Sequence, residues 1–427
     1  MNPDTMELAV TALGAAGDGL ARLPDGGPCF VPRSLPGETL AVRDLGKRGN
    51  GRLAEPEAVL RASPDRVGPP CPHFAACGGC ALQHWADAPY AEWKRGKLVE
   101  ALSRAGFAEV SVAPLVRTPP RARRRADLAL RRRPDGGGVA LGFHARVGGT
   151  VLDLQTCEVL DPRLVALFDP LRDLLRGLPA LRREGSAVVN LLDTGPDLLL
   201  RTDGALDAPA RAKLADFAAA RGVPRVAWAL GDRAPEVAAQ HGPAAIRFGG
   251  TAVHPPPGAF LQASPAGEAA IREAVLAGLP ERLPGRAAIA ELHAGVGTLS
   301  FALAERARVN AYEASAEAVG ALEAAAGRAG ARIKAVRRDL VRQPLLPAEL
   351  KPFAAVVLDP PFGGAPEQVP LLARGRVPRV VYVSCNPAAL ERDAQALKGA
   401  GYRVVSAVPV DQFLWSPHLE AVVAFAL

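Results

Sequence analysis

Residues 287–300 read AAIAELHAGVGTLS, an apolar run that ends at Leu292, passes Gly295 and Gly297, and leads directly into a helical pattern. Further short apolar runs follow along the chain, and helical patterns separate them. Such alternation is typical of buried parallel strands in a doubly wound α/β sheet. We therefore expect an α/β domain over residues 251–427. The predicted strands are Ala287–Leu292, Val309–Glu313, Ile333–Val336, Ala354–Leu358 and Val377–Val383, with an edge hairpin formed by Arg403–Val410 and Leu419–Leu427.

The N-terminal 70 residues have a different pattern, in which short alternating runs are separated by Gly and Pro. This pattern predicts strands at Met6–Ala12, Gly27–Pro32 and Glu38–Asp44, and a small β-barrel is their natural closure. Barrels of this size commonly bind oligonucleotides, and a purely structural barrel is the alternative. The sequence therefore predicts a barrel domain over residues 1–70.

Residues 71–250 are predicted to form a central α+β domain that opens with a cysteine cluster. A basic amphipathic stretch, Tyr90–Ala105, indicates a helix. Two alternating runs, 126–133 and a second run that ends at Arg146, flank a turn at Pro134–Gly138 and indicate a hairpin with arginines crowded at both ends.

Composition places broad limits on the protein. The chain has 427 residues, 49% of them hydrophobic, which is enough apolar material for two or three packed domains. Its 51 Lys and Arg against 44 Asp and Glu give a net charge of +7, which suits a polyanionic partner without proving one. The first residues are not typical of a secretory signal. Charges, Gly or Pro interrupt each long apolar stretch, so we expect no transmembrane helix. We expect a cytoplasmic monomer that does not bind membranes, in which clustered cysteines hold metal or do chemistry.

The two glycines after the first predicted strand indicate a cofactor pocket. Gly295 and Gly297 would let the backbone pass close to a ligand where such sheets bind cofactors, although a tight turn without a ligand is the alternative. Glu313 ends the second strand roughly 20 residues after the first, a spacing along the chain at which an acidic side chain can accept hydrogen bonds from ribose hydroxyls. Asp339 ends the third strand. Ser300 stands where a third glycine would complete a dinucleotide motif. A nucleoside such as S-adenosylmethionine is therefore favoured over a dinucleotide.

The fourth strand leads into Asp359-Pro-Pro-Phe362, and the fifth leads into Ser-Cys385-Asn-Pro. The first segment alone suits an amino-methyltransferase that binds the exocyclic nitrogen of adenine or guanine. The neighbouring Cys385 favours a different reaction, because carbon 5 of uracil is a poor nucleophile until a thiolate adds at carbon 6. A base must then remove the carbon 5 proton, and Glu420 in Trp415-Ser-Pro-His-Leu-Glu420 is the candidate. A buried core cysteine and a surface glutamate are the structural alternatives.

The cysteine cluster has the spacing C-x5-C-x2-C, and a fourth cysteine lies beyond the predicted hairpin. Four cysteines can hold either zinc or a four-iron four-sulfur cluster, and the arrangement of three plus one remote favours iron and sulfur. A set of unrelated reduced cysteines is the alternative. The candidate ligands are Cys71, Cys77, Cys80 and Cys157.

With these motifs assembled, the chain resembles the RNA uracil-5 methyltransferase family, especially its branch with an N-terminal TRAM barrel and an iron-sulfur cluster. The resemblance covers nearly the whole chain and implies a C-terminal class I, Rossmann-like methyltransferase domain. It also implies Cys385 as the nucleophile, Glu420 as the base and the four cysteines above as cluster ligands. In the cofactor pocket it implies Gln262, His293, Gly295, Thr298, Glu313, Asp339 and Asp359. The sequence departs from the family pattern at His293, Thr298 and Ser264.

The resemblance further implies an RNA partner, with 23S ribosomal RNA favoured and tRNA as the alternative. A uridine in folded RNA cannot reach a buried thiolate, so we expect the target base to flip out of its stack. Arg121 to Arg133 and the barrel would then hold the RNA backbone. Two other functions remain open: an amino-methyltransferase that uses Asp359-Pro-Pro-Phe362, and a non-catalytic iron-sulfur RNA-binding protein.

Overall fold

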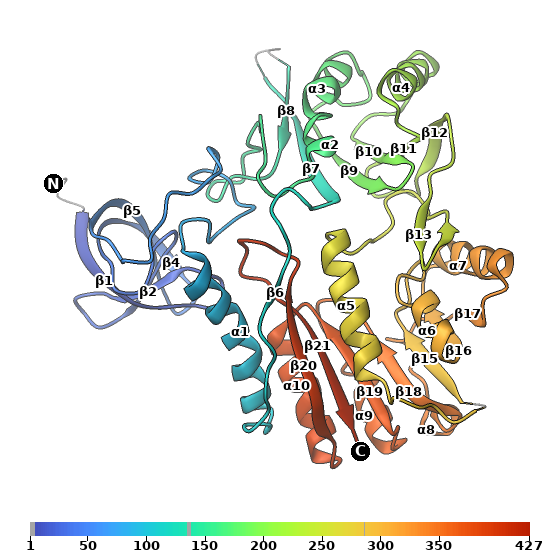
Figure 1. Cartoon of the computed structure of the whole chain (residues 1–427). Coiled ribbons are helices and arrows are strands. Elements are labelled where there is room, and N and C mark those ends of the chain that lie inside the picture. The colour runs from blue at the N-terminus through green and yellow to red at the C-terminus, as the bar shows by residue number, and fades with distance from the viewer. Residues whose placement is uncertain (1–4, 135–137, 286) are drawn as a thin grey trace. The chain divides into compact units, whose positions relative to one another are not determined.

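The computed structural model describes residues 5–134, 138–285 and 287–427 (Figure 1). The chain forms two compact units whose boundary falls within helix α1, Asp87–Arg104. The first unit comprises Met1–Lys94 together with two later segments, His144–Thr150 and Phe413–His418. The second unit comprises Arg95–Phe143, Val151–Gln412 and Leu419–Leu427.

A closed barrel with strand order β1-β2-β3-β5-β4 forms the N-terminal part of the first unit. Alternate residues such as Leu8, Val10 and Val31 point inward and fill its core together with Cys29. The barrel confirms the predicted fold of this region. The short β2 and the charged β5, which contains Pro56, lacked a clear sequence signal and were not predicted. The strands are β1 Thr5–Leu13, β2 Gly19–Arg22, β3 Pro28–Val31, β4 Thr39–Arg48 and β5 Gly51–Arg61.

The second unit contains a mixed sheet with order β12-β11-β10-β9-β7-β8. Strands β7 and β8 pair antiparallel, which confirms the predicted hairpin, although β8 ends at Gly142 and residues 135–137 of its turn lie outside the described ranges. The strands are β7 Arg125–Arg132, β8 Val139–Gly142, β9 Glu184–Leu192, β10 Gly195–Thr202, β11 Arg225–Leu230 and β12 Glu236–Gln240. The helices are α2 Pro162–Val165, α3 Phe168–Arg176 and α4 Ala208–Arg221; a small hairpin, β13 Ile246–Phe248 and β14 Thr251–Val253, follows them.

The C-terminal part of the second unit confirms the predicted doubly wound sheet. Its order is β17-β16-β15-β18-β19-β21-β20-β6. The strands β15, β16, β17, β18 and β19 are parallel to one another. Strand β21 inserts antiparallel between β19 and β20. The two-residue β6 pairs with β20 and was too short to predict. The strands are β6 Val116–Arg117, β15 Ala288–Leu292, β16 Arg308–Glu313, β17 Ile333–Arg337, β18 Phe353–Leu358, β19 Arg379–Ser384, β20 Arg403–Asp411 and β21 Glu420–Ala426.

Helices cover both faces of this sheet. Ile289 of β15 packs in one apolar cluster with α5, α6 and α7, whereas its neighbour Ala290 packs in another with α9 and α10. Burial on both faces explains why these strands read as continuous apolar runs rather than alternating ones. No helix in the described ranges is long and apolar enough to cross a membrane. The helices are α5 Pro265–Gly278, α6 Ser300–Arg306, α7 Ala316–Ala329, α8 Pro347–Leu350, α9 Val369–Arg374 and α10 Pro387–Gly399.

Candidate active site

The turn between β15 and α6 is shaped by its two glycines. Gly297 has φ +99°, and a Cβ there would lie 2.5 Å from Leu322 Cδ1, so a side chain cannot be accommodated without movement. Gly295 has φ +56° and open space around it. His293 also has a positive φ, 63°, and burial lowers its pKa. The space beside the Gly295 Cα is therefore free, and its role in a cofactor turn stays a prediction.

Glu313 fixes this turn to the end of the second parallel strand. Its Oε2 accepts from the Gly295 N–H at 3.0 Å, and its Oε1 accepts from the Ser315 N–H at 2.8 Å. Asp339 lies beyond β17 and accepts at Oδ1 from backbone N–H groups at 3.1 and 3.2 Å. The charges of Glu313 and Asp339 both act on His293. Thr298 is partly buried in the same turn. The structure thus gathers the predicted cofactor residues of β15, β16 and β17 at one edge of the sheet.

Asp359 directly follows β18, and Gln262 lies just before α5. The Nε2 of Gln262 donates to Oδ2 of Asp359 at 2.9 Å, which connects two segments 97 residues apart. Burial raises the pKa of Asp359 to about 6, while the bond from Gln262 opposes this shift. The prediction that both belong to one pocket is consistent with this contact.

Cys385 follows β19, whose last residue Ser384 pairs with Ala421 of the antiparallel β21. Glu420 is the first residue of β21, so it neighbours this pair on the partner strand. Next to Cys385, Asn386 caps α10 through its side-chain oxygen and donates from Nδ2 to the Phe362 carbonyl at 2.9 Å. The loops after β18 and β19 are therefore held together beside the thiol.

The electrostatics of this edge are dominated by buried acids. Burial, and then the charges of Glu420 and Asp359, raise the pKa of the Cys385 thiol to about 12. Burial and the Asp359 charge likewise raise the pKa of Glu420 well above its usual range. Only 3% of Glu420 is exposed, and within the described residues its Oε1 has no hydrogen-bond partner. A thiol beside a buried carboxyl group can supply a nucleophile and, once the carboxyl is ionised, a proton acceptor at the oxygen that has no hydrogen-bond partner.

Two residues of this region, Glu291 and Gln412, were not among those predicted from the sequence. Glu291 of β15 is buried and accepts from Ser300 Oγ at 2.5 Å, and burial raises its pKa to about 8. Gln412 follows β20 and donates from Nε2 to Glu420 Oε2 at 2.6 Å. An acidic residue inside an apolar run was a detectable signal for Glu291. The position of Gln412 depends on segments distant in sequence.

The arginines between 121 and 133 differ in exposure and in their partners, and the expectation that they contact RNA stays a prediction for those with exposed side chains, Arg121, Arg131 and Arg133. Arg124 is only 6% exposed and forms an ion pair with Glu268. Arg132 donates to the carbonyls of Leu175, Leu178 and Leu181. The other ion pairs are Arg121–Glu158, Arg131–Glu184 and Arg133–Asp153. Arginine crowding alone did not distinguish exposed side chains from internally paired ones.

The cysteine cluster begins in the first unit, where Cys71, Cys77 and Cys80 precede α1, whereas Cys157 precedes α2 in the second unit. Cys77 is buried, which raises its pKa, and its Sγ accepts from the Gly79 N–H at 3.4 Å. The charge of Cys71 also acts on Cys77. Within the part of the chain that the structure describes, no group of three or more His, Cys, Asp or Glu side chains is arranged to hold a metal ion.

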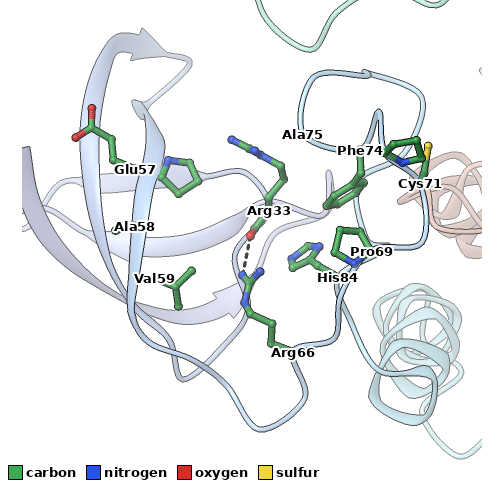
Figure 2. A pocket seen from close by; sticks show the side chains of 12 residues that line it. Arg33, Glu57, Ala58, Val59, Arg66, Pro69, Cys71, Phe74, Ala75 and His84 are labelled. Carbon is green, nitrogen blue, oxygen red and sulfur yellow. Dashed lines mark hydrogen bonds between the residues drawn. The ribbon is translucent and has the colours of Figure 1, made fainter. Parts of the chain in front are cut away.

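Cys71 also lines a pocket of about 470 Å³ in the first unit (Figure 2). The rings of Phe74 and His84 lie next to each other in it, 5.4 Å apart and tilted by 35°. On the barrel side, Arg66 donates to the Arg33 carbonyl at 2.8 Å. Burial lowers the pKa of His84 to about 4, so this imidazole is neutral at physiological pH. The pocket that Cys71 lines therefore contains an uncharged aromatic pair.

Comparison with known proteins identifies the family. The family model described as tRNA (Uracil-5-)-methyltransferase matches residues 284–426. An uncharacterized RNA methyltransferase of Caulobacter vibrioides is 42% identical over 98% of this chain and 99% of its own. The 23S rRNA (uracil(1939)-C(5))-methyltransferase RlmD of Chromohalobacter salexigens is 36% identical over 97% of this chain and 88% of its own. The crystal structure of Pyrococcus abyssi tRNA (uracil-54, C5)-methyltransferase with S-adenosyl-L-homocysteine has the same fold, with a TM-score of 0.74 and 22% identity over 99% of this chain and 100% of that one. The chain belongs to the RNA uracil-5 methyltransferase family.

Proposed function

We propose that this enzyme transfers a methyl group from S-adenosylmethionine to carbon 5 of a uridine in RNA, with 23S ribosomal RNA as the favoured substrate. The observation that carries the proposal is the placement of Cys385 beside the buried carboxyl of Glu420, at the edge of the sheet that also holds the glycine turn. The RlmD relative supports 23S ribosomal RNA, and the match to the family model supports the uracil target.

In the proposed reaction, Cys385 acts as the nucleophile. The thiol of Cys385 gives up its proton to solvent as Sγ forms a bond to carbon 6 of the uracil ring, and the electron pair of the C5=C6 bond becomes available at carbon 5. When bound, S-adenosylmethionine would supply the methyl group to carbon 5 and would leave as S-adenosylhomocysteine. Glu420 then takes the proton from carbon 5, the C5=C6 bond re-forms, and the Sγ–C6 bond breaks to return the thiolate.

Several residues of the chain suit the binding of the cofactor. The free space beside Gly295 and the carboxylate of Glu313, which accepts from the Gly295 N–H, would lie beside the ribose of the cofactor. Gln262 and Asp359 lie toward the reacting groups, since both connect to the carboxyl network beside Cys385. We also assign His293, Thr298 and Asp339 to this pocket, and we keep the domain limits 1–70, 71–250 and 251–427 as part of the proposal.

We further propose that Cys71, Cys77, Cys80 and Cys157 hold a four-iron four-sulfur cluster. The thiolate chemistry fits, and so does the Gly79 N–H that donates to Cys77 Sγ, because hydrogen bonds to sulfur are usual in such sites. The described side chains do not by themselves form a closed metal site, and the proposed methyl transfer uses none of these cysteines. Iron and sulfide analysis of protein purified without oxygen tests this. Stoichiometric zinc without sulfide would contradict it.

The decisive experiment for the reaction uses RNA that contains 5-fluorouridine. Fluorine at carbon 5 cannot leave as a proton, so the protein–RNA adduct should survive denaturation. Transcripts of 23S ribosomal RNA and of tRNA that carry 5-fluorouridine in place of uridine, and no natural modification, are incubated with the protein and S-adenosylmethionine. We expect an adduct with the ribosomal transcript that Cys385→Ala abolishes. Methylation that persists in Cys385→Ala would instead support an amino-methyltransferase.

A further inference from the structure

The side chain of Gln412 connects the proposed base, Glu420, to Gln262 of the proposed cofactor pocket. Its Nε2 donates to Glu420 Oε2 at 2.6 Å and to Gln262 Oε1 at 2.8 Å, and its Oε1 accepts from the Ala263 N–H at 2.9 Å. Only 3% of Gln412 is exposed. Reversal of the amide would set its carbonyl against the Glu420 carboxyl and its NH₂ against the Ala263 N–H. The surrounding groups therefore fix the orientation of this amide.

A continuous chain of hydrogen bonds results, because Gln262 in turn donates to Asp359 at 2.9 Å. The backbone around Gln262 is itself held in place. Arg124 Nε donates to the Gln262 carbonyl at 3.0 Å, and Arg124 forms its buried ion pair with Glu268 of α5. The chain Asp359–Gln262–Gln412–Glu420 is thus anchored at its centre.

The packing around Gln412 is equally close. A Cβ added to Gly267 of α5 would lie 2.7 Å from the Cβ of Gln412, so the helix approaches this side chain at a residue without a side chain of its own. Because buried interiors rearrange little, the Gln412 side chain has few other positions to adopt.

We propose that Gln412 is a positioning residue for the methyl transfer: it holds Oε2 of Glu420 and thereby aims the open Oε1 at the proton of carbon 5. This inference rests on the proposed function. The step it serves is the transfer of the carbon 5 proton to Glu420 Oε1, with the C–H electron pair forming C5=C6 and the Sγ–C6 pair returning to Cys385. Without Gln412 the carboxyl can rotate, and the proton acceptor is no longer fixed at one place.

The test is the variant Gln412→Met, which keeps the length of the side chain and removes its hydrogen bonds. The substrate is a 23S ribosomal RNA transcript that carries tritium at carbon 5 of uridine, with S-adenosylmethionine in excess. Methyl incorporation reports the earlier steps, and tritium release reports the proton transfer. We expect tritium release to slow by on the order of 10- to 100-fold, and methyl incorporation in the first turnover to change much less. A denaturation-resistant adduct should then accumulate on ordinary uridine.

A buried glutamine away from this network provides the control. Gln368 is 1% exposed, and among the contacts described its side chain bonds only to the backbone of Leu345, so Gln368→Met reports a general loss of stability. Equal slowing of methyl incorporation and tritium release in Gln412→Met, without an adduct, would overturn the proposal. If Gln412→Met does not fold, Gly267→Ala decides, because it displaces Gln412 and keeps the amide; an unchanged ratio of the two rates in that variant would also overturn it. Failure of the wild-type protein to trap 5-fluorouridine RNA would instead refute the proposed function itself.

Discussion

Cys385 and Glu420 neighbour the same cross-strand pair, Ser384 of β19 and Ala421 of β21. The proposed nucleophile and base therefore lie side by side where β19 ends and the antiparallel β21 begins. Neighbouring antiparallel strands hold facing side chains about 5 Å apart. The closeness has an electrostatic consequence, because the charge of Glu420 is the second cause, after burial, of the raised pKa of the Cys385 thiol. The free enzyme therefore keeps its thiol protonated at neutral pH.

The reactivity of Cys385 toward iodoacetamide tests this environment without RNA. Its pKa of about 12 lies far above neutral pH, so the alkylation rate should rise about tenfold per pH unit as the thiolate fraction grows. Asp359, with a pKa of about 6, is charged at pH 8 and raises the thiol pKa. Asp359→Asn should therefore speed alkylation at pH 8 by about 3- to 10-fold. Peptide mass spectrometry at Cys385 measures the rate. Asp339→Asn is the matched control, and equal acceleration in both variants would contradict the prediction.

Glu420→Gln should separate the two halves of the proposed reaction. The amide cannot accept the carbon 5 proton, so methyl transfer to RNA should occur once and the adduct should persist on ordinary uridine. Turnover should fall by at least about 100-fold. Gel electrophoresis under denaturing conditions detects the adduct. Normal release of methylated RNA by this variant would assign the base to another residue.

The sequence could predict those parts of the structure that depend on local pattern. The parallel strands were predicted because both of their faces are buried, and the position of Cys385 after a strand was predicted because Asn386 and a proline follow it. Gln412 was not found, because its partners Gln262 and Ala263 lie about 150 residues earlier in the chain. Arg124 was misjudged for the same reason, since only the fold brings Glu268 to it. Local pattern fixes elements, whereas long-range contacts decide which polar side chains are exposed.

Tyr382 supports the loop that follows Asp359 and is expected to contribute to stability. Its hydroxyl donates to Asp393 Oδ2 at 2.6 Å, and Asp393 is 2% exposed and also accepts from the Ala365 N–H at 2.8 Å. Tyr382→Phe should lower the free energy of unfolding by about 1.5–3 kcal/mol, because a charged acceptor loses a donor. Urea unfolding measures this. Tyr402→Phe, which removes a bond to the Val377 carbonyl at 2.7 Å, should cost about 0.5–1.5 kcal/mol. The reverse order would contradict the argument.

The two glycines of the cofactor turn should respond differently to alanine. Both have positive φ, which costs a non-glycine residue about 1–2 kcal/mol, but only Gly297 lacks room for a Cβ. Gly297→Ala should therefore lower the melting temperature more than Gly295→Ala and abolish binding of S-adenosylmethionine, because Leu322 must move and the turn with it. Calorimetric titration measures the binding. Equal effects of the two substitutions would show that steric contact with Leu322 is unimportant.

Glu291 should make the stability of the enzyme depend on pH. Burial raises its pKa to about 8 in the folded protein, against about 4.3 for an unperturbed glutamate. Between these values the folded state keeps a proton that the unfolded state has lost, so stability is highest at low pH within this window and falls as pH rises. The slope for one proton is up to about 1.4 kcal/mol per pH unit. Glu291→Gln should remove this contribution. Between pH 5 and pH 7.5 the unfolding free energy of the wild-type protein should therefore fall relative to that of the variant. Ser300→Ala, which removes the bond that lowers the pKa of Glu291, should retain the slope and extend it above pH 8. Parallel curves for wild type and Glu291→Gln would show that Glu291 titrates alike in the folded and unfolded chains.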